Sequence, residues 1–367
     1  MYDYVVVGAG SAGCVLASRL SEDPACRVLL LEAGGPDRSP FIHMPAGITK
    51  LMESEYDWAY WTVPQARMKG RRMYWPRGRT LGGSSSMNAM IYVRGQTSDY
   101  DHWRQLGNEG WSFDDVLPYF RKAERNEELD GPLHGLDGLL NVAGLRYRNP
   151  LSEVFLAAAE EAGIPRNADF NGAGQEGCGF YQVTQRNARR CSAAVAYLRP
   201  AMQRPNLTVA TRAMALEILL EKGRAVGVRY AEGGAVKSAR AEREVIISGG
   251  AINSPQLLLL SGIGPAEELK AVGIDCRHHL PGVGKNLQDH LNVNVIVRCE
   301  KPLTYDGQDR PLPSLVNGFR FLFGKTGPAT SNIAECGGFI RSSLAPETPD
   351  IQLHFIPAYV IDHARVK

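Results

Sequence analysis

A glycine-rich loop and one acidic residue are the first features of the sequence that could do chemistry. The loop is Gly8-Ala9-Gly10-Ser11-Ala12-Gly13, and Glu32 ends the apolar run that follows it. Gly8 permits a tight turn, Gly10 lets backbone N–H groups approach a pyrophosphate, and Gly13 allows close helix–strand packing. Glu32 can accept both ribose hydroxyls and would repel a 2′-phosphate, so the pattern predicts a dinucleotide other than NADP. The alternative is a glycine-rich turn beside a surface glutamate.

The elements around this loop are those that must position it. Tyr4–Val7 predicts a buried parallel strand, the loop opens a helix that reaches Leu20, and Arg27–Leu31 predicts a second strand ending at Glu32. Together they form a βαβ unit, which does not by itself distinguish NAD from FAD.

Beyond this unit the sequence alternates irregular and regular segments. Residues from Gly34 to about Arg104 show little periodicity but many aromatic residues, which predicts ordered loops packed over a ligand. Ser112 and Asp115 form a capping box, and Asn149 caps a helix that begins at Pro150. Further strands are expected at 207–211, 216–220 and 225–230, another after a Gly233-Gly234 turn, and a last one at 244–248. A helix is expected to start at Ser254-Pro255, and a tail from about 293 to 367 should alternate strands with proline-rich turns and include a strand at 350–355.

Composition excludes several function classes. The formal net charge is +2, which argues against nucleic-acid binding by phosphate neutralisation. No apolar run approaches the roughly 18 residues of a membrane span, and no signal peptide is visible. The seven cysteines form no C-x-x-C pair, which favours a reducing compartment over disulfides or zinc. We therefore expect a cytoplasmic protein without a metal site, with peripheral attachment at the inner membrane as the alternative.

Two longer motifs point to a specific family. Residues 78–101 contain Gly82-Gly83 followed by three serines and an apolar stretch, a loop that suits a flat ring system more than a second phosphate. This stretch resembles the first signature of the glucose–methanol–choline oxidoreductases, and residues 250–264 resemble the second. The resemblance spans nearly the whole chain. It implies FAD as the cofactor.

The resemblance also implies which residues hold the flavin. We expect pyrophosphate or ribityl contacts at Gly249-Gly250, a backbone contact to adenine at Ala215, and a lining of the flavin by Gly82, Gly83, Ser84 and Asn88-Ala89-Met90-Ile91. The predicted cofactor-binding residues are therefore Gly8, Gly10, Gly13, Glu32, Ala33, Gly82, Gly83, Ser84, Asn88, Ala89, Met90, Ile91, Ala215, Gly249 and Gly250.

Other positions bear on covalent attachment and on catalysis. Some relatives carry a flavin-linked histidine where this chain has Met87, so FAD should be held non-covalently. His354 resembles a pocket histidine of choline-oxidising relatives, although a histidine facing the core or a partner strand is the alternative. Glu335 is a second pocket candidate, with a structural acid as its alternative. Asp289-His290 is interpreted as structural.

The expected fold class is α/β, α+β overall: a Rossmann-like FAD-binding domain and a second, antiparallel-sheet substrate domain. Residues 1–34 plus about 200–292 are assigned to FAD binding, 35–199 to flavin-covering loops and helices, and about 293–367 to the start of the substrate domain. By resemblance, the catalytic histidine and the last flavin-domain elements should lie beyond Lys367. The chain would then be a fragment that does not turn over alcohols alone.

The resemblance implies oxidation of a small-molecule alcohol to an aldehyde or ketone, with hydride transfer to the flavin. No second nucleotide fingerprint is present, so a quinone, a cytochrome or oxygen should take the electrons. Two alternatives stay open: an FAD-binding hydroxynitrile lyase-like enzyme, and a non-catalytic flavin-binding remnant.

Overall fold

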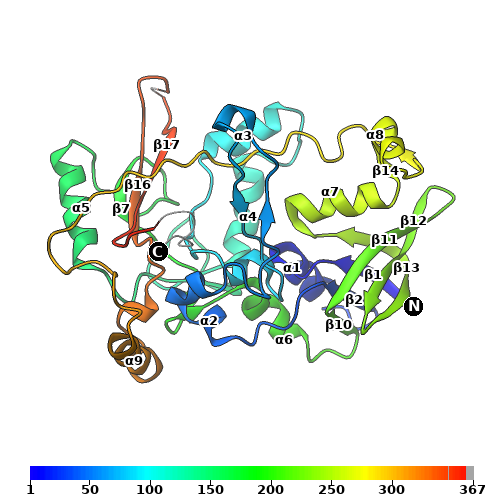
Figure 1. The fold of residues 1–367 in the computed structure, drawn as a ribbon, viewed down its shortest axis with the longest axis horizontal. Helices are drawn as coiled ribbons and strands as arrows, with labels where there is room; N and C mark the ends of the chain where they lie inside the picture. The colour runs from blue at the N-terminus through cyan, green and yellow to red at the C-terminus, as the bar shows by residue number, and fades with distance from the viewer. Residues whose placement is uncertain (346, 361–367) are drawn as a thin grey trace. The chain divides into compact units, whose positions relative to one another are not determined.

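A computed structural model describes residues 1–345 and 347–360, and the chain divides into two compact units (Figure 1). The first unit comprises Met1–Arg38, Leu51–Met87 and Ser192–Val293, and the second comprises Ser39–Lys50, Asn88–Cys191 and Asn294–Lys367. The division into three parts expected from the sequence gives each segment a functional role. Contacts between residues do not test such roles, so the three-part division stays a prediction.

A six-stranded sheet of order β10-β2-β1-β13-β12-β11 forms the centre of the first unit. The neighbours β10, β2, β1 and β13 pair in parallel, whereas β13, β12 and β11 form an antiparallel meander. The strands are β1 (Tyr2–Val7), β2 (Val28–Glu32), β10 (Leu207–Thr211), β11 (Ala213–Glu221), β12 (Arg224–Glu232) and β13 (Ala235–Ile247). All were expected, but the two strands predicted after Gly233-Gly234 and at 244–248 form one continuous strand, β13, whose first half belongs to the meander.

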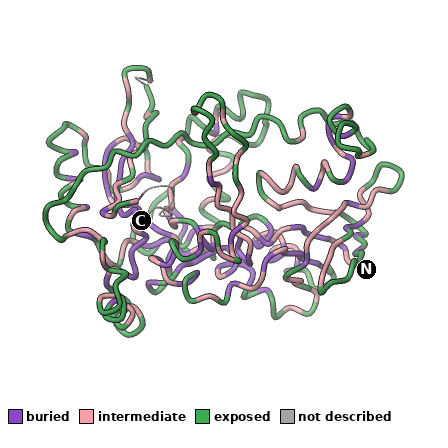
Figure 2. Tube along the Cα trace, viewed as in Figure 1, coloured by how far each residue is buried: buried purple, intermediate pink, exposed green. Residues whose placement is uncertain are grey.

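The core of this unit follows from its apolar strands. Every residue of β2 is buried, and Val5, Leu29 and Ile218 belong to one hydrophobic cluster. In β1, Tyr2 and Tyr4 are partly buried and the other residues are buried (Figure 2). Helix α1 (Ser11–Leu20) packs on β1 and β2, and helix α7 (Gly250–Leu260) packs on β11. This βαβ arrangement confirms the predicted Rossmann-like fold.

The start of α7 corrects the sequence-based prediction. The helix begins at Gly250, not at Ser254-Pro255, and Pro255 lies inside it. Proline is usually a signal for the first helical turn. Here the strand-to-helix turn is made by Gly249 and Gly250, the latter with a φ of +83°, so the helix begins directly after the glycine pair.

An antiparallel sheet of order β17-β16-β7 lies in the second unit, as expected for the second domain. Its strands are β7 (Gly177–Phe180), β16 (Cys336–Ile340) and β17 (Ile351–Phe355). Helix α5 (Pro150–Glu161) begins after the Asn149 cap, and α4 (Phe113–Ala123) has the predicted Ser112–Asp115 capping box. Among the helices that the sequence did not predict, α9 (Pro311–Phe319) lies in the tail that was expected to hold only strands and turns, and α3 (Thr97–Gln105) lies at the end of the segment that was expected to form loops.

The remaining elements are short. In the first unit they are β3 (Tyr60–Trp61), β4 (Tyr74–Trp75), α6 (Arg199–Ala201), β14 (Ile263–Gly264), α8 (Ala266–Ala271) and β15 (His278–His279). In the second they are α2 (Pro40–His43), α3 (Thr97–Gln105), β5 (Glu124–Asn126), β6 (Leu140–Val142), β8 (Gln185–Arg186) and β9 (Arg189–Arg190). Among the described residues, no helix has both the length and the apolar character needed to cross a bilayer.

Candidate functional site

The loop between β1 and α1 is tightly packed against its own backbone. A Cβ on Gly13 would lie 1.9 Å from the carbonyl oxygen of Gly8, and a Cβ on Gly8 would lie 2.7 Å from that of Ser248. Gly8 also has a φ of +96°. A Cβ on Gly10, in contrast, would have its nearest neighbour at 3.9 Å. Gly8 and Gly13 are therefore required by the fold, whereas Gly10 leaves open space above the loop.

That open space lies at the N-terminus of α1. Gly10 is the cap residue and offers no side-chain hydrogen bond, and the first turn carries no acidic residue. The first backbone N–H groups of a helix lack partners within the helix, and the helix dipole makes this end favourable for an anion. The end of α1 thus has the polarity and the room that a pyrophosphate needs.

Glu32 is buried at the end of β2 and connects the loop at Ala9 to the turn at Gly34. Its carboxylate accepts hydrogen bonds from the N–H of Ala9 at 2.8 Å and from the N–H of Gly34 at 2.8 Å. Burial raises the pKa of Glu32, and the two N–H donors and the positive charge of Arg79 oppose that shift. Each carboxylate oxygen keeps a second lone pair, so the group can still accept a ligand hydroxyl.

These features border one cavity of about 680 Å³ in the first unit. It lies within the size range of small-molecule and cofactor sites, roughly 300–1,000 Å³. The predicted residues that line it are Gly8, Gly10, Glu32, Ala33, Gly83, Ser84, Ala215, Gly249 and Gly250. Gly13 and Gly82 are not among its lining residues.

The Gly82-Gly83 pair is required by the packing of the protein backbone itself. The N–H of Gly82 donates to the carbonyl of Ala9 at 2.7 Å, and a Cβ on Gly83 would lie 2.8 Å from the Cα of Gly10. Both glycines also have positive φ values. The pair therefore lets two backbone segments approach each other, and Gly83 and Ser84 then border the cavity.

Aromatic residues on the cavity wall were missed as site residues. Trp58 and Tyr60 stack with centroids 5.7 Å apart and an interplanar angle of 7°, and both line the cavity. The Tyr60 hydroxyl donates to Asn253 Oδ1 at 2.5 Å, which ties the stack to α7. The aromatic content of residues 34–104 was the available signal. It predicted ordered loops over a ligand but did not single out these two rings.

The predicted segment Asn88–Ile91 lies in the second unit and is held from several sides. Arg190 donates to the carbonyl and to Oδ1 of Asn88, at 2.7 and 2.9 Å, and Asn332 donates to the carbonyl of Ala89 at 2.9 Å. The backbone N–H of Thr184 donates to the carbonyl of Met90, whose φ is +59°. Burial lowers the pKa of Arg190 to about 9. The segment is rigidly positioned, which suits a ligand-contacting backbone.

The two predicted pocket residues differ sharply in environment. Glu335 is fully buried and accepts hydrogen bonds from Ser152, Tyr305, Ser331 and the backbone N–H of Asn149. With four hydrogen bonds already made, the carboxylate of Glu335 has little capacity to accept one from a substrate. The geometry therefore favours a structural role for Glu335.

His354, in contrast, is exposed on β17. Its ring lies 5.6 Å from that of Tyr181, centroid to centroid, and its backbone pairs with Gly337 on β16. It stays a candidate. Within residues 1–345 and 347–360, no group of three His, Cys, Asp or Glu could hold a metal ion.

Comparison with known proteins identifies the family. The family model described as GMC oxidoreductase matches residues 2–292, most of the chain. The chain belongs to the GMC oxidoreductase family. It is 50% identical to human mitochondrial choline dehydrogenase, over all of this chain and 63% of that protein. It is 49% identical to alcohol dehydrogenase [acceptor] of Pseudomonas putida, over all of this chain and 67% of that protein. The chain thus spans about two thirds of the length of these relatives.

Solved structures agree with this assignment. Pyridoxine 4-oxidase from Mesorbium loti superposes with a TM-score of 0.85 at 33% identity, covering 96% of this chain and 66% of the oxidase. Formate oxidase from Aspergillus oryzae superposes with a TM-score of 0.90 at 27% identity, covering 98% of this chain and 68% of that enzyme. Proteins of this family are FAD enzymes, so FAD is the cofactor.

The residues of the first unit fit this cofactor on structural grounds. The lining of the cavity includes the Gly8–Gly10 loop, the strand that carries Ala215, and Glu32. The open Cβ position at Gly10 leaves room for a phosphate, and the stacked rings of Trp58 and Tyr60 offer a flat wall. A phosphate end, a carboxylate and an aromatic wall are what a flavin dinucleotide needs.

The contrast between Gly10 and Gly13 gives a direct test. We expect Gly10→Ala to leave the unfolding temperature of the FAD-free protein unchanged but to weaken FAD binding about tenfold or more, because the methyl group fills the phosphate space. Gly13→Ala should instead destabilise the protein by about 1–3 kcal/mol or more through overpacking. Thermal unfolding without FAD and FAD titration separate the two effects. Equal loss of stability in both variants would contradict the assignment.

Glu32 should serve both the fold and the cofactor. In Glu32→Gln one of the two buried N–H donors would face an amide NH₂ group, which costs about 1–3 kcal/mol of stability. Loss of a charged acceptor should also weaken FAD binding about tenfold. Glu244→Gln, at an exposed position of β13, is the matched control and should change neither quantity. An unaltered FAD affinity in Glu32→Gln would remove Glu32 from the cofactor site.

Proposed function

We propose that the protein oxidises a small alcohol to an aldehyde or ketone with bound FAD. Family membership carries the proposal, and the cavity of the first unit supports it because it can hold the cofactor. The named relatives are a choline dehydrogenase and an alcohol dehydrogenase. A primary alcohol, with choline as one member of the class, is therefore the proposed substrate.

Residues of the first unit would bind the cofactor through its nucleotide. The N–H groups at the start of α1, above Gly10, would hold the pyrophosphate. Glu32 would accept the ribose hydroxyls, and the backbone of Ala215 would meet the adenine. Gly249 and Gly250, at the start of α7, would meet the pyrophosphate or the ribityl chain. Ala33 and Ser84 border the same cavity, and we propose them as further contacts.

The family resemblance assigns the flavin ring of the cofactor to the segment Asn88–Ile91. Bound FAD supplies a ring system that accepts the α-hydride of the alcohol, while the hydroxyl proton passes to a base. The backbone of Asn88–Ile91 would orient that ring, held by Arg190 and Asn332. His354 is the proposed pocket histidine, and we assign no proton acceptor among the described residues.

The electron acceptor is proposed on the same family grounds. A quinone, a cytochrome or oxygen would take the electrons, since the sequence holds one dinucleotide fingerprint. The absence of paired cysteines supports a reducing compartment, for which we propose the cytoplasm, with peripheral attachment to the inner membrane as the alternative.

Flavin reduction by alcohols tests the proposed reaction. The full gene product, loaded with FAD, is mixed anaerobically with choline and a series of primary alcohols while the flavin absorbance is followed. We expect at least one alcohol to bleach the flavin in a saturable manner. An unbleached flavin with every alcohol, together with cleavage of a cyanohydrin, would favour the lyase alternative. An unbleached flavin without any turnover would favour the non-catalytic one.

The mode of cofactor attachment gives a second test. Met87 occupies the position where covalently flavinylated relatives carry histidine, and a thioether cannot form that bond. Met87 is also buried. We therefore expect acid precipitation of the FAD-loaded protein to leave all of the flavin in the supernatant. Flavin that stays with the pellet after washing would contradict non-covalent binding.

A further inference from the structure

The outer part of the β3–β4 hairpin, residues 61–74, has no role in the proposed function. The two strands pair antiparallel, with Trp61 opposite Tyr74. Between them the chain carries four basic residues within six positions, namely Arg67, Lys69, Arg71 and Arg72. The sequence from residue 58 to residue 98 contains no Asp or Glu, so the hairpin has no acid of its own to balance these charges.

Backbone hydrogen bonds give the hairpin a defined shape up to its tip. The N–H of Thr62 donates to the carbonyl of Met73 at 2.9 Å, and the N–H of Gln65 donates to the carbonyl of Arg71 at 3.0 Å. A Cβ on Gly70, at the turn, would meet no atom of the described residues within 4 Å. The tip therefore projects into open space instead of packing on the protein.

The four basic side chains of the tip are exposed, and their charges are not balanced locally. Within the described residues, none of the four forms an ion pair with an acid. Arg72 donates one hydrogen bond, from Nε to the carbonyl of Thr62 at 3.1 Å, which leaves its charge in place. The tip is therefore a concentrated positive surface that attracts anions.

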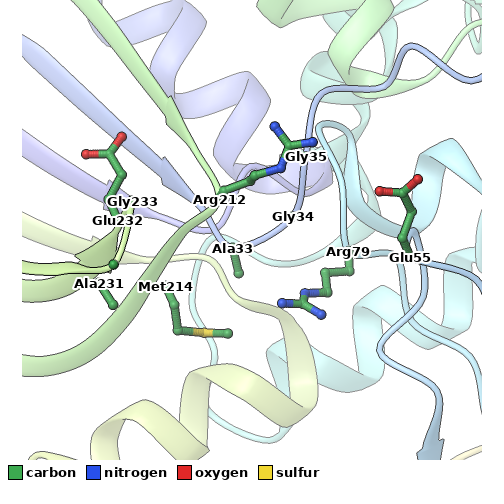
Figure 3. Close-up of a pocket in the computed structure, with 11 residues that line it drawn as sticks. Ala33, Gly34, Gly35, Glu55, Arg79, Arg212, Met214, Ala231, Glu232 and Gly233 are labelled. Atoms are coloured by element: carbon green, nitrogen blue, oxygen red, sulfur yellow. The ribbon is translucent and has the colours of Figure 1, made fainter.

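The neighbouring acids make their contacts at the base of the hairpin. Asp57 is buried and accepts a hydrogen bond from the N–H of Arg77 at 2.9 Å. The carboxylate of Asp289 lies 4.0 Å from the Arg77 guanidinium. Glu55 lines a pocket together with Arg79, beside the turn after β2 (Figure 3). These carboxylates thus act on the base and not on the basic tip.

Apolar side chains lie on the same hairpin as the basic residues. Val63 is 71% exposed and Trp61 is 43% exposed, both on the arm that leads to the tip. Tryptophan and aliphatic side chains favour the boundary between lipid headgroups and acyl chains, and clustered lysine and arginine favour anionic headgroups. An acidic protein surface would match the charges but would offer no counterpart to the exposed apolar pair.

We propose that the hairpin tip, residues 61–72, docks on an anionic phospholipid surface. The four basic side chains would meet the lipid phosphates, while Trp61 and Val63 would enter the headgroup boundary. The proposal gives a defined surface to the peripheral attachment considered above, and it does not depend on the proposed reaction.

Sedimentation with lipid vesicles tests the proposal. The full gene product, loaded with FAD and without substrate, is mixed with vesicles of phosphatidylcholine alone or of phosphatidylcholine with phosphatidylglycerol. We expect saturable binding to the anionic vesicles, little binding to the neutral ones, and weaker binding at raised salt because salt screens the charges. Since no substrate is present, the outcome is independent of alcohol oxidation. Equal binding to both kinds of vesicle, or no binding to either, would overturn the proposal.

Paired double variants locate the lipid contact. Lys69→Gln/Arg71→Gln should weaken binding to anionic vesicles about thirtyfold, which corresponds to about 1 kcal/mol for each charge near such a surface. Lys222→Gln/Lys270→Gln removes the same charge from exposed positions elsewhere in the first unit and should bind as the parent does. Equal affinities of the two double variants would show that net charge, and not the hairpin, governs binding, and would contradict the proposal.

Tryptophan fluorescence tests the apolar part of the contact. Brominated lipid in the anionic vesicles should quench part of the fluorescence of the parent, and this quenching should be largely lost in Trp61→Phe. All the substituted side chains are exposed, so FAD content and unfolding temperature should stay at the parent's values. Quenching that is unchanged in Trp61→Phe would overturn the proposed contact. Binding to polyglutamate without binding to anionic vesicles would also overturn it, because the hairpin would then recognise an acidic protein.

Discussion

The buried carboxylate of Glu32 is the interaction on which the rest of the site depends. By accepting the N–H groups of Ala9 and Gly34, it fixes the loop above α1 to the turn after β2. Gly34 in turn packs on the backbone of Arg79, and the N–H of Gly82 reaches back to Ala9. One carboxyl group thus sets the positions of the phosphate loop, the ribose end and the Gly82-Gly83 segment, and its two N–H donors explain why an acid is tolerated in a buried position.

The nucleotide half of the fold could be predicted from local signals. Strand and glycine patterns predicted β1, α1, β2 and the strand at Leu207–Thr211, because a buried parallel strand is short, apolar and bounded by turn residues. Predictions failed where tertiary packing decided the outcome. Pro255 was interpreted as a helix start although the Gly249-Gly250 turn begins α7, and α9 was missed in a tail rich in turn residues.

The candidate site was only partly accessible to sequence reasoning. The glycines and Glu32 were found because their spacing reflects a local backbone requirement. Trp58, Tyr60 and Arg79 were not, since their roles arise from side chains that meet across long sequence separations. The same limit applies to Arg190, whose contact with Asn88 joins residues about one hundred positions apart. The residues that make such contacts have no fixed separation in the sequence, so a spacing pattern does not reveal the contacts.

Hydrogen–deuterium exchange with and without FAD tests the central claim most directly, namely that FAD lies in the cavity of the first unit with its pyrophosphate at the start of α1. The account predicts that FAD slows amide exchange at residues 10–12 and at 249–253, which border the cavity. Exchange in the exposed hairpin turn at Gly233-Gly234, outside that cavity, should change little. Unaltered exchange at residues 10–12 on FAD binding, with protection elsewhere in the chain, would contradict the account.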